Sequence, residues 1–185
     1  MTFLCEVATQ LKQIQDSQFK LAANLIQGIK ISGMVFCVGN GGSSGTMSHL
    51  ASDLNNLGVM SYCLTDNVPR LTALTNDKGW ENVYRDMLNG FIKPEDLLII
   101  ASVNGSSGKS EDGESWSSNL YDVAELFKER KAKVLSIVGN DGGSLEEISD
   151  LCICISSKDP FIVEGIHSVA THGICDALKR SKQID

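Results

Sequence analysis

Residues 34–54, MVFCVGNGGSSGTMSHLASDL, predict a β-strand, a glycine-rich turn and a helix in direct succession. The β-branched and aromatic residues at positions 34–38 favour the strand, and the glycines that follow permit tight turns with positive φ and uncovered amides. A helix that begins near Ser43 points its free N–H groups and the positive end of its dipole at this turn. The stretch therefore predicts an anion site that suits a phosphate group. The glycines are Gly39, Gly41 and Gly42.

His49 and Asp53 lie four residues apart on the helix after the turn, so their side chains share one face. An imidazole and a carboxylate in this relation form either a metal-ligand pair or an acid–base pair. The sequence thus places a metal-ligand or acid–base pair on the helix whose N-terminus forms the predicted phosphate site.

The rest of the chain alternates strands with helices. Uninterrupted apolar runs such as residues 97–101, LLIIA, are typical of strands buried on both faces of a parallel sheet. The alternation predicts an α/β fold, with a parallel sheet covered on both faces, in one domain of 185 residues. The apolar spacing in residues 3–31 predicts one long helix, which either packs against another subunit or only covers the sheet. We expect further strands at residues 59–64, 134–138 and 151–155, and further helices at 68–74, 80–87, 119–131 and 162–180.

Charge, apolar runs and cysteine content indicate which partners and which cellular compartment suit the protein. The net charge is −7, which argues against nucleic-acid backbones and anionic membranes as partners. No apolar run reaches membrane-spanning length, and no N-terminal signal sequence is visible. The six cysteines lack CxxC spacing and several lie in apolar runs, which favours buried reduced thiols and a cytoplasmic protein.

Three of the predicted strands end in glycine- and serine-rich loops, at residues 39–43, 102–118 and 139–144. Parallel sheets bind ligands at these carboxyl ends. The dinucleotide pattern GxGxxG fails at Ser44, and a P-loop ending at residues 108–110 fails because its first glycine falls on Val103. What remains is a hydroxyl-rich cradle for a phosphomonoester, although loops are often rich in serine and glycine without binding anything. Its serines are Ser43, Ser44, Ser102, Ser106, Ser107, Ser117 and Ser118.

The last predicted helix carries the other two histidines. Glu164 and His172 are eight residues apart, about 80° around a helix, so both can border one cleft. His167 lies off that line. A lone histidine is more often a hydrogen-bonded structural residue than a ligand, but two histidines and two carboxylates paired on two helices favour a site.

Six motifs follow one another along nearly the whole chain: Gly39-Asn40-Gly41-Gly42-Ser43, residues 49–54 (HLASDL), residues 64–69 (LTDNVP), residues 75–77 (TND), residues 138–143 (VGNDGG), and residues 164–167 (EGIH) with His172. Together they resemble the sugar isomerase (SIS) domain family, in particular its phosphoheptose isomerase branch. The resemblance implies a three-layer α/β/α sandwich with a five-stranded parallel sheet. It also implies a single SIS domain over residues 1–185, an N-terminal oligomerisation helix over residues 1–31, and a homotetramer with active sites at subunit interfaces.

The same resemblance implies an aldose–ketose isomerase that converts sedoheptulose 7-phosphate to a heptose 7-phosphate for surface-polysaccharide precursors. It implies that Asp53 is the catalytic base and His172 its acid–base partner. A Zn²⁺ ion would be held by four residues, His49, Asp53, Glu164 and His172. The implied phosphosugar contacts are Asn40, Gly41, Gly42, Ser43, Asp77, Ser102, Ser117 and Glu164.

The sequence departs from the family pattern at four positions. The family's catalytic glutamate is Asp53 here, which shortens the reach of the carboxylate by about 1.5 Å, and a misplacement of this size can cost on the order of 100-fold in rate. Glu164 stands at a glutamine position, Leu57 at an arginine position and Phe161 at a polar sugar-contacting position. These departures keep open a second class, a non-catalytic SIS protein that senses a phosphosugar or associates with a replication initiator. Retention of the four ligand-type residues favours the enzyme.

Overall fold

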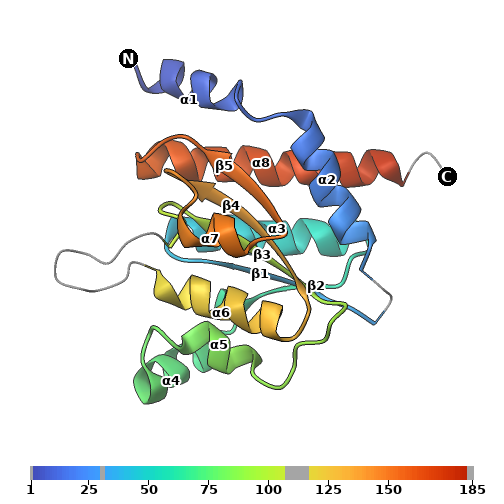
Figure 1. Ribbon diagram of the computed structural model, residues 1–185, viewed down its shortest axis with the longest axis vertical. Helices are drawn as coiled ribbons and strands as arrows, with labels where there is room; N and C mark the ends of the chain where they lie inside the picture. The colour runs from blue at the N-terminus through green and yellow to red at the C-terminus, as the bar shows by residue number, and fades with distance from the viewer. Residues whose placement is uncertain (1, 30–31, 107–116, 183–185) are drawn as a thin grey trace.

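The computed structural model describes residues 2–29, 32–106 and 117–182 (Figure 1). Its centre is a five-stranded, all-parallel sheet with the strand order β2-β1-β3-β4-β5. The strands are β1 Val35–Gly39, β2 Ser61–Cys63, β3 Leu97–Ser102, β4 Lys133–Gly139 and β5 Leu151–Ile155. The predicted parallel α/β sheet is confirmed.

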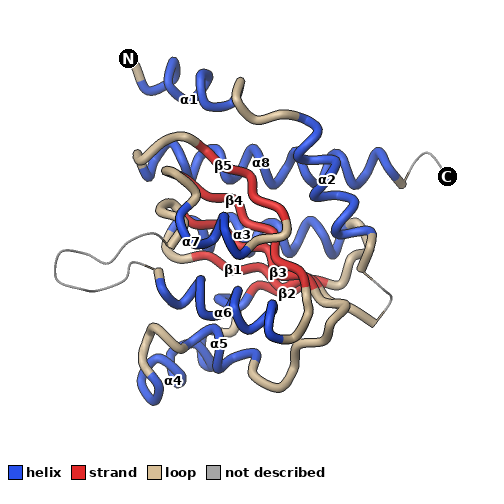
Figure 2. The backbone as a smooth tube through the Cα atoms, viewed as in Figure 1, coloured by secondary structure: helices blue, strands red, loops and turns tan. Residues whose placement is uncertain are grey.

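Helices cover both faces of this sheet, as Figure 2 shows. One layer holds α2, α3 and α8, and the other holds α4, α5, α6 and α7. The helices are α1 Phe3–Leu11, α2 Asp16–Gln27, α3 Gly42–Asn56, the short 3₁₀ helix η1 Leu64–Asp66, α4 Val68–Lys78, α5 Val83–Leu88, α6 Ser118–Glu129, α7 Gly143–Ile148 and α8 Pro160–Ser181. The three-layer α/β/α sandwich that the resemblance implies is therefore present.

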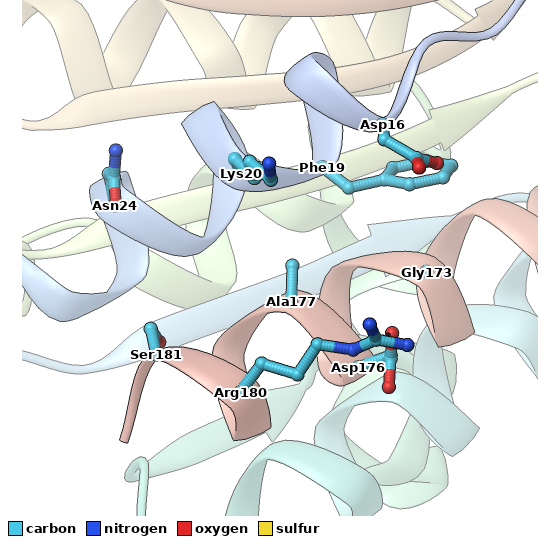
Figure 3. A pocket seen from close by; sticks show the side chains of 9 residues that line it. All are labelled: Asp16, Phe19, Lys20, Asn24, Gly173, Asp176, Ala177, Arg180 and Ser181. Atoms are coloured by element: carbon cyan, nitrogen blue, oxygen red, sulfur yellow. Dashed lines mark ion pairs between the residues drawn. The ribbon is translucent and has the colours of Figure 1, made fainter. Parts of the chain in front are cut away.

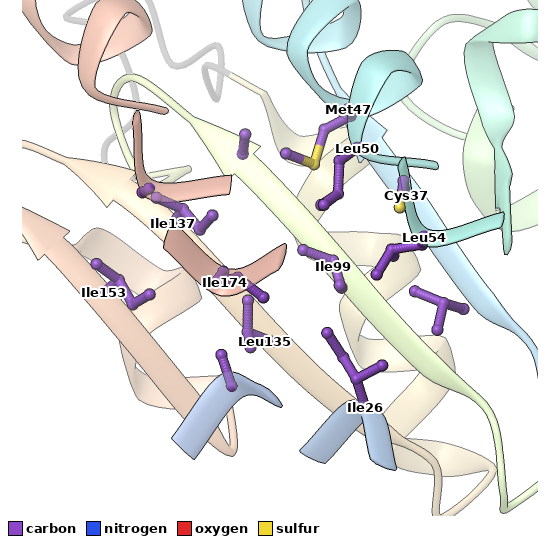
Figure 4. Close-up of a cluster of buried hydrophobic side chains, with 14 of the residues drawn as sticks. Ile26, Cys37, Met47, Leu50, Leu54, Ile99, Leu135, Ile137, Ile153 and Ile174 are labelled. Carbon is purple, nitrogen blue, oxygen red and sulfur yellow. The ribbon is translucent and has the colours of Figure 1, made fainter. Parts of the chain in front are cut away.

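The two cores follow from the alternation of side chains along each strand. In β1, Val35 and Cys37 face the layer of α2, α3 and α8, whereas Phe36 and Val38 face the other layer. All of β1 and β3 is buried because both faces are covered, which explains their unbroken apolar sequences. Figure 4 shows the first core, where side chains of α2, α3 and α8 meet those of the strands.

The N-terminal segment differs from the single helix predicted over residues 3–31. It forms two helices, α1 and α2, separated by residues 12–15. Gln15 is the residue before α2, and its backbone N–H donates to Oε1 of Gln18 at 3.0 Å. This local hydrogen bond replaces the one that a continuous helix would make at that point, so the apolar stripe continues across a break in the backbone. α1 packs against α8, whereas α2 packs against both α8 and the sheet.

Candidate active site

The turn after β1 lies beside the end of β3. Gly39 is paired in register with Ala101, so Asn40 and Ser102 leave the sheet next to one another. α3 begins at Gly42, with Gly41 at φ 56° as the residue before it. The first turn of a helix lacks internal acceptors for most of its N–H groups. Apart from Ser44, whose N–H donates to the Gly41 carbonyl at 3.1 Å, the amides of this turn are available to an anion at the carboxyl edge of the sheet.

A hydrogen-bond network fixes Asn40, which has φ 60°. The Tyr84 hydroxyl donates to Asn40 Oδ1 at 3.0 Å. Asn40 Nδ2 donates to Asn119 Oδ1 at 3.0 Å and to Ser117 Oγ at 3.4 Å. Burial raises the pKa of Tyr84, which keeps its phenol protonated as a donor. Asn40 therefore ties the β1 turn to the N-terminus of α6, with Ser117 between them.

Tyr84 and Asn119 are part of this network but were not predicted from the sequence. Both side chains are buried, Tyr84 in the second core and Asn119 on the inner face of α6. In the sequence, only Asn119 indicated such a network, because a polar residue on the apolar face of a helix needs a hydrogen-bond partner. Tyr84 is indistinguishable by sequence from an ordinary core aromatic residue.

The serines of the cradle have different environments. Ser102 ends β3 and is buried. Ser106 has φ 57° and donates its hydroxyl hydrogen to the carbonyl oxygen of Ser117 at 3.0 Å. Ser44 donates back to the Gly41 carbonyl at 2.7 Å, so its hydroxyl serves the turn itself. Ser107 lies outside the described residues.

Ser43 is buried and faces His167 of α8. Its Oγ lies 3.3 Å from His167 Nδ1. Burial lowers the pKa of His167 to about 4, so the imidazole is neutral at pH 7. His167 thus faces the turn from behind and does not join the other two histidines, in line with its place off their face of the helix.

α3 and α8 run side by side and in the same direction. The contacts advance together along both helices, from Ser43 with His167 to Thr46 with Ser168, whose hydroxyl oxygens are 3.3 Å apart. Farther along both helices, about two turns after Thr46 and one turn after Ser168, Asp53 of α3 meets His172 of α8. The parallel helices therefore connect the glycine-rich turn to the histidine positions.

His49, Asp53 and His172 form one cluster. Asp53 Oδ1 lies 3.6 Å from His49 Nε2, and Asp53 Oδ2 lies 3.8 Å from His172 Nε2. The two imidazole rings are 5.2 Å apart, with an angle of 85° between their planes. One ligand atom from each residue falls within 4.8 Å of the others, a spacing compatible with a shared metal ion. The side chains are accessible, with exposed fractions of 61% for His49, 29% for Asp53 and 58% for His172.

The structure does not bring Glu164 into this cluster, although the resemblance implies a four-residue metal site. Its carboxylate lies over the glycine-rich turn, where a Cβ on Gly42 would be closer than van der Waals contact to both carboxylate oxygens. The eight residues between Glu164 and His172 correspond to about 12 Å of helical rise. The glutamate is thus at the phosphate end of the α3–α8 pair, and the lack of a side chain on Gly42 makes room for it.

Asp77 is also apart from the cluster within one chain. It lies near the end of α4, exposed to solvent, and accepts a hydrogen bond from Asn76 Nδ2 at 3.0 Å. α4 packs against α5 and η1 on the opposite face of the sheet from α3 and α8.

Two of the departures from the family pattern have clear positions. Leu57 follows the last turn of α3, partly buried against the first core, where an arginine would have to turn outward. Phe161 lies in the first turn of α8, and 77% of it is exposed in the part of the chain that the structure describes.

A pocket of about 480 Å³ lies between α2 and α8, away from these residues (Figure 3). Phe19 of α2 lies directly over Gly173, where a Cβ would come within 2.6 Å of the ring. Asp176 and Arg180 form an ion pair of 2.8 Å at its border. None of the residues predicted for the site lines this pocket. Over the part of the chain that the structure describes, no helix is both long enough and apolar enough to cross a membrane.

Comparisons with known proteins show which proteins this chain is similar to. No protein-family model matches it. It is 36% identical over 156 residues to a lincomycin biosynthesis protein of Streptomyces lincolnensis, covering 78% of this chain and 55% of that protein, so it spans about half the length of this relative. It is 28% identical over 176 residues to a phosphoheptose isomerase of Helicobacter pylori, covering 92% of this chain and 86% of that protein.

Its fold matches that of a phosphoheptose isomerase from Neisseria gonorrhoeae with a TM-score of 0.83 and 21% identity, over 96% of this chain and 93% of that one. The structural match covers the sheet and both helical layers, and the sequence match to the isomerases extends over nearly the same length. The comparisons thus support the resemblance that the sequence motifs carry, because the chain is similar to phosphoheptose isomerases over nearly its whole length, in sequence and in fold.

Proposed function

We propose that the protein is an aldose–ketose isomerase of phosphosugars, with sedoheptulose 7-phosphate as substrate and a heptose 7-phosphate for surface-polysaccharide precursors as product. The observation that carries this proposal is the cluster of His49, Asp53 and His172 beside a glycine-rich helix N-terminus. An acid–base group and an anion site on one pair of helices are what a phosphosugar isomerase requires.

The phosphate group binds at the turn between β1 and α3. The free amides of the first turn of α3 and its dipole favour an anion there, and Ser43, Ser102 and Ser117 supply hydroxyl groups around it. Six residues separate Ser43 from His49, which is about 9 Å of helical rise. A seven-carbon chain with bonds of about 1.5 Å spans a similar length, so the carbonyl end of the sugar reaches the cluster.

Asp53 removes the proton next to the carbonyl, and His172 returns a proton at the neighbouring carbon after an enediolate has formed. The aspartate is suited to this role because its two oxygens face the two imidazoles and it stays partly open to solvent. The shorter side chain relative to the family's glutamate requires the sugar to lie closer to α3 than it would otherwise.

The donor set of the cluster also fits a divalent metal ion. Two imidazole nitrogens and a carboxylate match a zinc site with three protein ligands and an open position. We assign His49, Asp53 and His172 as the ligands of a Zn²⁺ ion, with Glu164 as a fourth if its side chain turns away from Gly42. Such an ion would polarise the sugar carbonyl. Asp77 would contact sugar only from another subunit.

We further propose that the protein is a homotetramer in the cytoplasm, with each site completed by a neighbouring subunit. Large apolar side chains on α1, α2 and α8 are exposed in one chain, which supports burial of these helices against other copies. They are Phe3, Leu4, Leu21, Phe161 and Val169. Light scattering on a size-exclusion column tests the tetramer, and Val169→Asp should reduce the mass if α8 lies in the interface.

The direct test is to incubate purified protein with sedoheptulose 7-phosphate and to follow aldose formation, with and without added zinc. Turnover that is lost in His172→Ala while phosphosugar affinity remains is the expected result. Binding without turnover in the wild type would instead identify a phosphosugar sensor, the second class left open by the sequence. A protein that neither binds nor converts the phosphosugar would refute both the isomerase and the sensor.

A further inference from the structure

We propose that His167 is a positioning residue that orients the hydroxyl group of Ser43 toward the phosphate group of the substrate. The proposal rests on the proposed function, because it requires that a phosphate occupies the β1–α3 turn. His167 itself touches no substrate. It lies behind the turn, on α8, in a different part of the sequence from the serine, 124 positions away.

The contact between the two residues is enclosed. Ser43 is 1% exposed and His167 is fully buried, and Ser43 Oγ lies 3.3 Å from Nδ1 of the imidazole. A serine hydroxyl is both a donor and an acceptor and rotates freely about its C–O bond unless a neighbour fixes it. The imidazole is the neighbour that fixes it here.

The direction of this hydrogen bond follows from the other ring nitrogen. Nε2 is buried and has no hydrogen-bond partner among the described residues. The Ile137 backbone lies near the ring and raises the pKa of the imidazole, against the larger effect of burial. A neutral imidazole carries one ring proton, and a buried N–H without a partner is costly. The proton is therefore on Nδ1, where Ser43 Oγ accepts it.

This arrangement leaves the hydroxyl hydrogen of Ser43 free. Phosphate oxygens only accept hydrogen bonds at neutral pH when the group is a dianion, so an oriented donor is what the turn must offer. With the opposite tautomer, Ser43 would donate to the histidine and present lone pairs to the phosphate. His167 thereby selects which way the hydroxyl points, and it does so from the same helix that holds His172.

A double-mutant cycle separates positioning from simple structural support. The variants are Ser43→Ala, His167→Leu and the pair, with dissociation constants measured for inorganic phosphate and for sedoheptulose 7-phosphate. We expect each single variant to bind about tenfold more weakly, as for the loss of one hydrogen bond to a charged group. The double variant should bind no more weakly than Ser43→Ala, since the histidine acts only through the serine. His167→Asn, whose amide can donate from near the position of Nδ1, should restore most of the affinity.

Ser168→Ala is the matched control, because it removes another hydroxyl contact between α3 and α8 one turn away and should leave both dissociation constants unchanged. The proposal would be overturned if the fold-losses in affinity of the two single variants multiplied in the double variant. Unchanged affinity in His167→Leu would overturn it as well. If the wild type binds phosphosugar without isomerising it, the isomerase fails while the cycle still decides the role of His167.

Nuclear magnetic resonance of protein with ¹⁵N-labelled histidine gives a readout that does not depend on binding or turnover. Long-range nitrogen–proton correlations distinguish the two neutral tautomers. The Nδ1–H form is expected for His167 at pH 7.5 in the free protein, and the Nε2–H form would contradict the assigned direction of the hydrogen bond.

Discussion

Replacing His167 by leucine should remove a defined part of the acid sensitivity of this protein. Burial lowers the pKa of His167 from 6.5 to about 4 in the folded chain. In the unfolded chain the imidazole takes up a proton near pH 6.5, whereas the folded chain cannot until about pH 4. Folding is therefore opposed increasingly as the pH falls from about 6.5 to about 4, and this histidine has no effect on the pH dependence above that window.

The magnitude follows from the same two values. Each pH unit inside the window lowers the free energy of unfolding by about 1.4 kcal/mol, so between pH 7.5 and pH 5.0 this one residue contributes a loss of about 2 kcal/mol. His167→Leu lacks the titration. At pH 7.5 the variant is less stable than the wild type because it lacks the hydrogen bond and packs differently. The difference in free energy of unfolding between the two proteins should therefore shrink by about 2 kcal/mol as the pH falls to 5.0.

Urea unfolding of both proteins at pH 7.5, 6.5, 5.8 and 5.0 measures this difference. Carboxylates titrate in both proteins alike and cancel in the comparison. His172→Leu, which removes an exposed imidazole from the same helix, controls for the loss of a histidine as such. A difference between wild type and His167→Leu that stays constant within about 0.5 kcal/mol across the range would refute a neutral, buried His167.

Three further changes have expected outcomes. Asp53→Asn keeps the shape of the side chain but removes the charge between the imidazoles, so we expect turnover to fall by about 100-fold or more in an isomerase assay and bound metal to fall in elemental analysis. Gly105→Ala should lower the free energy of unfolding by about 2 to 3 kcal/mol in urea, since φ is 62° and the new Cβ would lie 2.1 Å from a carbonyl oxygen of the β4–α7 loop. Gly45 is a glycine of α3 with open space around it, so Gly45→Ala should instead raise the free energy of unfolding by about 0.5 to 1 kcal/mol. Tyr84→Phe deletes the donor to Asn40 and should cost about 1 to 2 kcal/mol by the same measurement, and an unchanged stability would mean that the network does not need the phenol.

Local features of this protein could be predicted from the sequence. The alternation of apolar strands with amphipathic helices predicted the parallel sheet, and the glycine-rich turn predicted where α3 begins. The approach of His49 to Asp53 was predictable too, because four residues on a helix fix it without any tertiary contact. The single helix over residues 3–31 was the exception, since the same apolar stripe continues across the break at residues 12–15.

Only the tertiary structure decided how the remote parts combine. α8 could have packed with any rotation about its axis, and its contact with α3 is what selects His172 for Asp53, puts His167 behind Ser43 and leaves Glu164 over Gly42. The physical reason is that periodicity along the chain specifies which face of a helix is apolar, whereas the partner of that face depends on how side chains of several elements fill a common core.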